Sequence, residues 1–158
     1  MKILKLSFVP VILLVVFLAS CSDDKVITNG SGNILIIDPT VTRTDQLGNE
    51  LGGDTTDWCS SSNTLFAFNA AYPNPTNDTV NFRFQLPEQD TISLMYQNAN
   101  GDTVVFIRDQ VLIAGVYTTQ FSASEHFIFS GVFRFMIRSK RFPSGGDYCR
   151  YYGDVQFY

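Results

Sequence analysis

The stretch Val80-Asn81-Phe82-Arg83-Phe84-Gln85-Leu86 places an apolar side chain at every second position and a polar one between them. Side chains of a β-strand point alternately to its two faces, so this period predicts a strand with one buried and one solvated face. The same alternation recurs over 92–96, 116–121, 133–138 and 155–157, and no stretch after residue 64 shows the helical period. The pattern therefore predicts about seven short antiparallel strands packed as an all-β sandwich.

Three of the predicted strands begin with the same short pattern, an Asp followed by Thr and a β-branched apolar residue. The copies start at Asp78, Asp90 and Asp102, twelve residues apart. Because Asp bonds turn amides and β-branched residues favour strands, we interpret the copies as strand starts. Between the last two copies, the sequence Asn-Ala-Asn-Gly predicts a hairpin turn in which Gly101 takes a positive φ. The following run, 103–108, is apolar on both faces, which favours a central strand.

The Asp-Thr-apolar pattern also resembles the O-glycosylation acceptor of bacterial envelope proteins. That resemblance implies four candidate acceptor residues, Thr55, Thr79, Thr91 and Thr103. Two interpretations stay open at this point, because the pattern fits plain strand starts as well as strand starts that also carry sugar.

The first twenty residues have the composition of a secretory signal. Lys2 and Lys5 precede an apolar run over 6–19 that is too short for a stable membrane span. The run ends in Leu-Ala-Ser-Cys21, which resembles the lipobox of bacterial lipoproteins. The resemblance implies removal of residues 1–20 and a lipid on Cys21 that anchors the chain in a membrane. Ser22 resembles the residue that directs such proteins to an outer membrane, and surface exposure stays open.

Residues 21–63 are rich in Gly, Ser and Asp, which is typical of a flexible tether. The apolar run over 34–37 predicts at most one short strand in this segment. We therefore expect three parts: a lipoprotein signal peptide at 1–20, a tether at 21–63 and the sandwich at 64–158.

A second resemblance begins at Tyr72-Pro73-Asn74-Pro75, directly before the quoted strand. Further on, the chain has Ala-Gly115-Val-Tyr and Ser-Gly131-Val-Phe steps. In order and spacing, residues 66–139 resemble a family of immunoglobulin-like modules. That family includes the Ig-like domain of flagellar hook-capping proteins and the type A C-terminal sorting domains of type IX secretion cargo. The resemblance implies an immunoglobulin-like sandwich with no catalytic residues. Its motif residues here are Tyr72, Pro73, Asn74, Pro75, Gly101, Gly115 and Gly131.

The chain departs from this family in two places. Phe121-Ser122 stand where the family often has Trp-Asp, and 149–158 continue past the point where sorting domains usually end. Two functions therefore remain. The leading one is a non-enzymatic, membrane-anchored envelope lipoprotein that presents the sandwich to an unknown envelope protein for interaction or assembly. The alternative is a sorting or secretion module related to type IX secretion.

With Cys21 lipidated, two cysteines remain in an oxidising compartment. We predict a disulfide between Cys59 and Cys149, which would join the end of the tether to the loop before the last strand; two free thiols are the alternative. Closing a loop of about 90 residues stabilises a fold by roughly 4 kcal/mol in the chain-entropy model.

Composition argues against several other classes of function. The formal net charge of −4 disfavours a nucleic-acid partner, which calls for a basic face. The single histidine, His126, offers no partner for a triad or a metal site, so we predict an exposed turn residue there. Three cysteines and one histidine do not match a common zinc spacing. We therefore expect no enzyme activity, no cofactor and no metal.

Overall fold

The computed structural model of this 158-residue chain describes residues 27–28, 34–35, 37–54, 56–60, 66–142 and 151–158. Seven strands form its body: β5 (Ala67–Phe68), β6 (Thr79–Leu86), β7 (Asp90–Gln97), β8 (Thr103–Leu112), β9 (Gly115–Ser122), β10 (Gly131–Ser139) and β11 (Tyr152–Phe157). One turn of 3-10 helix, η1 (Ser124–His126), follows β9. Among the described residues, no helix is long and apolar enough to cross a membrane. The predicted signal peptide and Cys21 lie outside the described residues.

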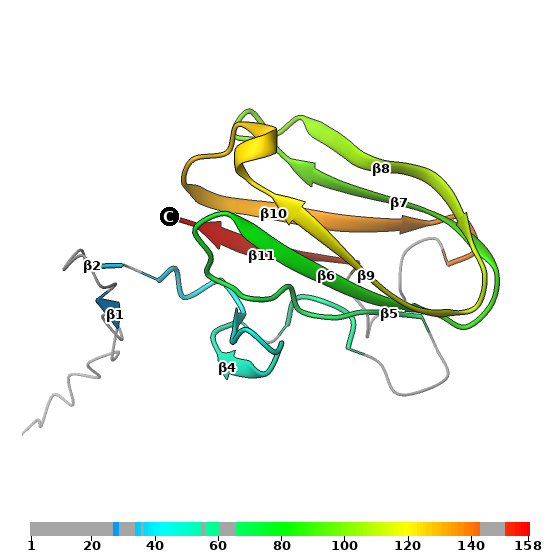
Figure 1. The fold of residues 1–158 in the computed structure, drawn as a ribbon, viewed down its shortest axis with the longest axis horizontal. Coiled ribbons are helices and arrows are strands. Elements are labelled where there is room, and N and C mark those ends of the chain that lie inside the picture. Colours follow the sequence, from blue (N-terminus) through cyan, green and yellow to red (C-terminus); the bar gives the residue numbers. More distant parts are fainter. Residues whose placement is uncertain (1–26, 29–33, 36, 55, 61–65, 143–150) are drawn as a thin grey trace, which may run out of the picture.

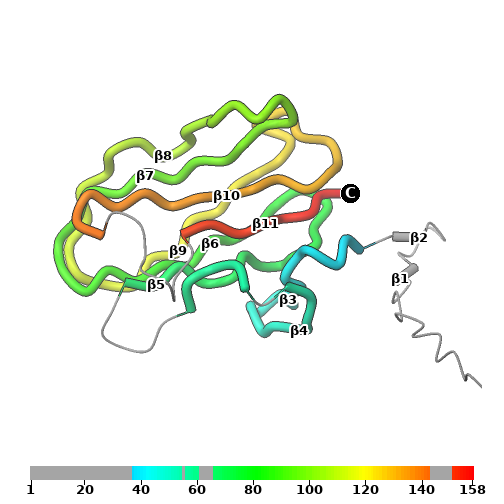
Figure 2. The backbone as a smooth tube through the Cα atoms, turned by 180° about the vertical axis from the view of Figure 1, so that it is seen from behind, coloured from blue at the N-terminus to red at the C-terminus, as the bar shows by residue number. Residues whose placement is uncertain are grey.

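The seven strands form two antiparallel sheets that pack face to face (Figure 1). One sheet has the order β5-β6-β9, and the other has the order β11-β10-β7-β8. Figure 2 shows the four-stranded sheet with β8, β7, β10 and β11 in order from top to bottom. Counted from β5, the first, second and fifth strands share one sheet, and the other four share the second. The predicted fold class, an all-β antiparallel sandwich of about seven strands, is confirmed.

The core is built from the alternating side chains that predicted the strands. Val80, Phe82, Phe84 and Leu86 of β6 are all buried, while Arg83 between them is exposed. Phe82 meets Phe135 of β10 across the two sheets, with 4.8 Å between the ring centroids. Burying each such side chain contributes about 1.5–3 kcal/mol, so the alternation drives the packing of the sheets.

The run over 103–108 does not form the central strand that its two apolar faces predicted. It belongs to β8, which lies at the edge of its sheet and whose residues are all half-exposed or exposed. The strand buried on both faces is β7, where Met95 lies between Met136 of β10 and Val105 of β8. The edge strand β8 thus has the more apolar sequence, whereas its neighbour β7 is buried although it carries the polar residue Ser93.

The Tyr72-Pro73-Asn74-Pro75 segment carries the chain from one sheet to the other. Tyr72 forms an antiparallel bridge to Asn81 of β6, and Thr76 forms a parallel bridge to Phe157 of β11. The Tyr72-Pro73 and Asn74-Pro75 peptide bonds are both cis. The prolines have no N–H and are incompatible with a helix interior, which suits a short extended crossing between sheet edges.

Asn74 is buried at the centre of this crossing and all three of its side-chain hydrogen bonds join different parts of the chain. Its Nδ2 donates to the carbonyl oxygens of Thr42 at 2.8 Å and Asp154 at 3.0 Å. Its Oδ1 accepts the N–H of Gln156 at 3.0 Å. Because a buried amide is costly unless it is bonded, these bonds fix the crossing against β11 and the N-terminal segment.

The segment before residue 64 is more structured than its composition predicted. Instead of at most one short strand, it has four: β1 (Ile27–Thr28), β2 (Ile34–Leu35), β3 (Arg43–Thr44) and β4 (Glu50–Gly52). Val41 is fully buried, and Trp58 is almost fully buried. Trp58 lies directly on Gly153 of β11, where an added Cβ would come within 2.0 Å of the indole ring. Hydrogen bonds and one aromatic ring therefore hold part of the expected tether on the sandwich.

We expect Asn74→Ala to lower the free energy of unfolding by about 2–4 kcal/mol, because two carbonyls and one N–H lose a buried partner together. Equilibrium denaturation of the full chain measures this change. Asn77→Ala is the matched control, since Asn77 lies in the same turn region and is exposed. Equal effects of the two substitutions would contradict the role given to Asn74.

Candidate functional site

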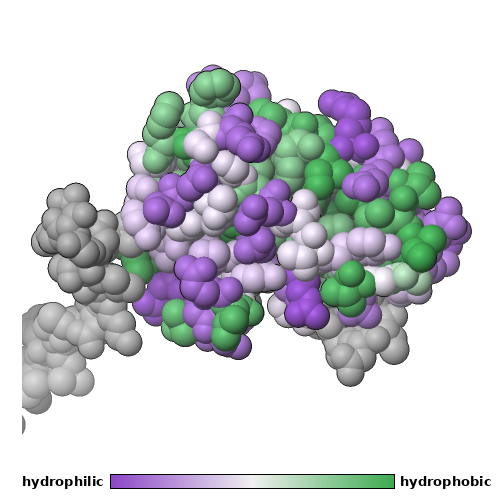
Figure 3. Space-filling model, viewed as in Figure 1, coloured by the Kyte–Doolittle hydropathy of each residue, from purple (hydrophilic) through white to green (hydrophobic). Residues whose placement is uncertain are grey.

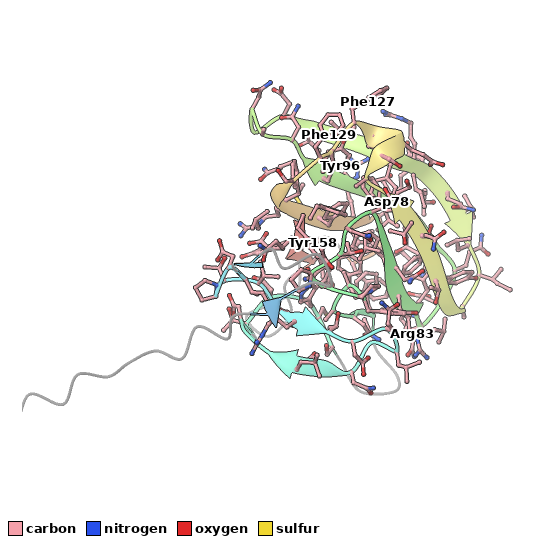
Figure 4. The ribbon with its side chains drawn as sticks, turned by 60° about the vertical axis from the view of Figure 1, so that its left-hand side comes forward. Asp78, Arg83, Tyr96, Phe127, Phe129 and Tyr158 are labelled. Atoms are coloured by element: carbon pink, nitrogen blue, oxygen red, sulfur yellow. The ribbon has the colours of Figure 1, made fainter. Side chains whose placement is uncertain are left out.

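Among the described residues, the loop between β9 and β10 carries the two most exposed aromatic side chains. Phe127 is 82% exposed and Phe129 is 81% exposed, whereas Ile128 between them is 8% exposed. The alternation places Ile128 into the core and both phenyl rings into solvent. Figure 4 shows Phe127 and Phe129 at the top of the molecule, above Tyr96. We call Phe127 and Phe129 the aromatic rim.

Asp78, directly before β6, holds this loop in place. Its Oδ1 accepts the N–H of Ser124 at 2.8 Å, and the hydroxyl of Ser122 lies 3.2 Å and 3.3 Å from its two oxygens. These hydrogen bonds hold the pKa of Asp78 below its ordinary value. The backbone N–H of Ser124 has the largest effect, and the Ser124 and Ser122 hydroxyls add to it. The carboxylate thus fastens the base of the loop by accepting hydrogen bonds in its ionised form.

The loop backbone is tightly turned at Phe127. Its φ of 57° lies in the left-handed region, and its N–H donates to the carbonyl of Ser124 at 3.3 Å. The next N–H, that of Ile128, donates to the carbonyl of Ala123 at 2.9 Å. A bulky residue in this region costs free energy, and strained positions of this kind occur often at ligand-contacting loops.

His126 differs from the exposed turn residue that its sequence context predicted. Its ring is half-buried and stacks on Phe121, with 4.4 Å between centroids and 10° between planes. Tyr96 meets the same ring edge-on at 5.8 Å. His126 therefore supports the loop from below and is packed among apolar rings. Among the described residues, no group of three or more His, Cys, Asp or Glu side chains could hold a metal ion.

A shallow open groove of about 400 Å³ separates the aromatic rim from the hairpin turn between β7 and β8. Its walls come from the rim, the His126 and Tyr96 rings, Phe133, and the turn residues 98–100. Asn98 is committed to that turn, because its Oδ1 accepts the N–H groups of Asn100 and Asp102 at 3.0 Å and 2.9 Å. The groove thus offers apolar ring faces beside one rigid polar turn.

Exposed hydrophobic residues also gather at the opposite end of the sandwich. Val111, Ile113 and Val116 are all more than half exposed where β8 turns into β9. Figure 3 shows hydrophobic surface both along the upper edge and at the right-hand end, with hydrophilic surface between them. Val111 of this second patch also lines an open hollow of about 340 Å³, whose other lining residues include Asp90, Lys140 and Arg141. The rim is distinguished from this patch by its aromatic side chains.

The residues singled out in the sequence are mostly structural. Gly101 takes a φ of 83° in the predicted hairpin turn, Gly131 takes a φ of 120° at the start of β10, and Gly115 begins β9. Thr79, Thr91 and Thr103 lie at the starts of β6, β7 and β8, and only Thr103 is fully exposed. Thr55, Cys21 and Cys149 lie outside the described residues. The interpretation of the Asp-Thr copies as strand starts is confirmed, and glycosylation stays a prediction.

Sequence reasoning did not find the aromatic rim or the role of Asp78. The signal available was the order Phe-Ile-Phe at 127–129, directly after a polar stretch that ends at His126. Read as part of a strand, this order predicts two buried rings. Only the η1 turn before it shows that the phenyl rings point outward and Ile128 inward.

Comparison with known proteins gives no match: no protein family, no curated protein and no solved structure matches this chain.

We expect Asp78→Asn to lower the midpoint of unfolding at neutral pH, because the amide replaces an ionised acceptor. The native pKa of Asp78 lies below its ordinary value of 3.8, so its stabilising effect is fully present above that value. The effect is lost as the pH falls through the lower native pKa. The difference between parent and variant in thermal unfolding should therefore shrink in acid. Glu125→Gln, an exposed charge removal in the same loop, is the control, and a difference that persists unchanged in acid would contradict the assignment.

Proposed function

We propose that this chain is a non-enzymatic, lipid-anchored envelope protein whose immunoglobulin-like sandwich binds a protein partner through the aromatic rim. The observation that carries the proposal is the exposure of Phe127 and Phe129 beside a groove, on a loop that the rest of the fold holds rigid. Loops at the ends of a sandwich are positioned by the scaffold and commonly carry binding residues.

Two neighbouring phenyl rings that are about four-fifths exposed leave a large apolar area in contact with water. Aromatic side chains at the centre of an interface supply a large share of the binding free energy. The loop beneath the rim is already ordered by Asp78 and by the stacking of His126 on Phe121, so binding orders little additional chain. A preordered loop retains more of its contact energy as affinity.

The open shape of the groove favours a protein over a small molecule. Small-molecule sites enclose most of their ligand, whereas here the rings project from the surface. The neighbouring turn offers amide groups in a fixed arrangement, and His126 is packed against Phe121 and Tyr96. These features suit a polar border around an aromatic contact, which is the usual anatomy of a protein interface.

The anchor in this proposal is the lipid on Cys21 that the lipobox resemblance implies. The described chain enters the sandwich at Asp38, whose N–H donates to the side chain of Gln156 near the end of β11 at 3.0 Å. Gln156 pairs with Val132 at the start of β10, three residues after Phe129. The segment that leads to the anchor thus reaches the sandwich at the end that carries the aromatic rim.

The proposal includes a disulfide between Cys59 and Cys149, supported by what surrounds Cys59. Cys59 is 2% exposed, and its Sγ lies 3.5 Å from the carbonyl oxygen of Phe66. The ring of Tyr151 packs on Phe66 with 4.6 Å between centroids. Cys149 lies outside the described residues, and Tyr151 follows it by two positions in the sequence.

The first test combines the anchor and the rim. In cells, a photo-crosslinking residue at position 129 of the full chain should give one discrete protein adduct, and Phe127→Ser should weaken that adduct several-fold. The same crosslinker at Arg108, an exposed residue of β8, is the control. Cys21→Ser should abolish fatty-acid labelling and release the chain from the membrane fraction.

Two outcomes would overturn the proposal. If position 108 gives the same adduct as position 129, the rim is not the binding surface. If export of the chain stops when type IX secretion is inactivated, the sandwich acts as a sorting module and the alternative function holds.

We expect the Cys59–Cys149 disulfide to stabilise the chain by about 4 kcal/mol relative to the reduced form, because it closes a long loop. Denaturation of the full chain with and without reductant measures the change, and Cys149→Ser should unfold equally in both conditions. Thiol titration of the denatured parent chain is the direct check. Equal thiol counts with and without reductant would show that no disulfide is present.

A further inference from the structure

Each sheet of the sandwich has two edges, and two of the four edges are covered by the chain itself. Cys59 pairs with Phe68 of β5, exchanging two backbone hydrogen bonds of 2.8 Å. Thr76 lies along β11, accepting the N–H of Tyr158 at 3.1 Å and donating to the carbonyl of Gln156 at 3.0 Å. The N-terminal segment and the crossing segment therefore occupy the open sides of β5 and β11.

The third edge, β8, carries the features that keep edge strands from pairing with other chains. It has Arg108 and Asp109 in its middle, and Asp109 has a φ of 44°. The register of its pairing with β7 shifts on both sides of Leu94. Asp109 also lies 3.8 Å from both Arg138 and Lys140. Charges and irregular backbone at an edge disfavour strand addition.

The fourth edge, β9, has none of these features. Its eight residues, Gly-Val-Tyr-Thr-Thr-Gln-Phe-Ser, include no charge and no proline. All eight pair with β6 without a shift in register. A long, regular, uncharged edge strand is a template for pairing with another strand.

The hydrogen bonds of β6 show which backbone groups of β9 face outward. Asn81 exchanges both of its backbone bonds with Tyr72, on the β5 side of the strand. The N–H and C=O groups of successive residues alternate in direction along an antiparallel strand, so those of Phe82 point toward β9, where its partner is Thr119. The residues of β9 on either side of Thr119 therefore direct their N–H and C=O groups away from β6. These outward positions are Val116, Thr118 and Gln120, which are all exposed.

We propose that β9 pairs with β9 of a second copy of this chain, antiparallel about a two-fold axis through Thr118. In this register Thr118 faces Thr118 of the other copy, and Val116 faces Gln120. Three hydrogen-bonded pairs supply six backbone bonds, because each such pair exchanges two. The two three-stranded sheets then become one continuous sheet.

A second copy fits this edge because the edge is self-complementary. Without a charge on β9, the symmetric register sets no like charges opposite one another, and facing Thr side chains are a favourable cross-strand pair. Arg83 is an exposed charge beside this edge and pairs with Thr118 from β6. Its distance to Arg83 of the other copy is about three strand spacings, roughly 14 Å, where salt screens the repulsion.

Cross-linking tests the register. The full chain with Thr118→Cys, in detergent, should form a disulfide-linked dimer on mild oxidation, because Cα atoms of a hydrogen-bonded pair lie about 5.5 Å apart. Thr103→Cys, an exposed threonine on the β8 edge, is the matched control and should give at least tenfold less dimer. The parent chain gives the background from its own cysteines. Equal cross-linking at the two positions overturns the proposal.

A second measurement tests the association itself without any cysteine. Sedimentation of the full chain over a concentration series should show a monomer–dimer equilibrium, and Thr118→Lys should weaken it at least tenfold by setting two ammonium groups face to face. Thr103→Lys makes the same change on the other edge and should leave the equilibrium unchanged. A parent chain that is monomeric throughout, or a T118K chain that dimerises as tightly as the parent, overturns the proposal.

Discussion

The buried side chain of Asn74 is the constraint on which the arrangement of the sandwich depends most. Its amide joins Thr42, Asp154 and Gln156, which belong to the N-terminal segment and to the last strand. None of these partners can shift without leaving a buried polar group unbonded, so their positions are determined together. The prolines on either side hold the crossing extended while the amide fixes where it crosses. One short turn motif thereby fixes how the two sheets are joined.

The N-terminal segment stabilises the sandwich chiefly through its backbone. Residues rich in Gly, Ser and Asp contribute few apolar side chains, so their composition predicts a tether. Yet Cys59 pairs with β5 and Thr44 exchanges backbone bonds with Asn74, and neither contact needs an apolar side chain. Among the described residues of this segment, the exceptions include Val41, which is fully buried, and Trp58, which packs on a glycine. Composition measures the capacity to form a core, and a segment that covers a sheet edge needs little of it.

The same distinction explains what could be predicted from the sequence. The period of two in β6 follows directly from burial of one face, so that strand and the fold class were predictable. The central place of β7 was not, because it depends on which strands become neighbours, and β8 has the more apolar sequence. The outward direction of Phe127 and Phe129 depends on the η1 turn, and His126 is stacked because β9 brings Phe121 beneath it. Such contacts between distant segments leave no local pattern.

The two proposed surfaces are compatible because β9 separates them. The proposed pairing uses Val116 to Gln120, whereas the loop that carries the aromatic rim begins at Ser124. A dimer formed along β9 therefore leaves both rims free, each held by its own Asp78. With the proposed lipid anchor, two copies in one membrane would meet at a high effective concentration, which favours a pairing that is weak in solution. A dimer would also present two rims to a partner, so that a modest affinity at each rim becomes a much tighter attachment when both are engaged.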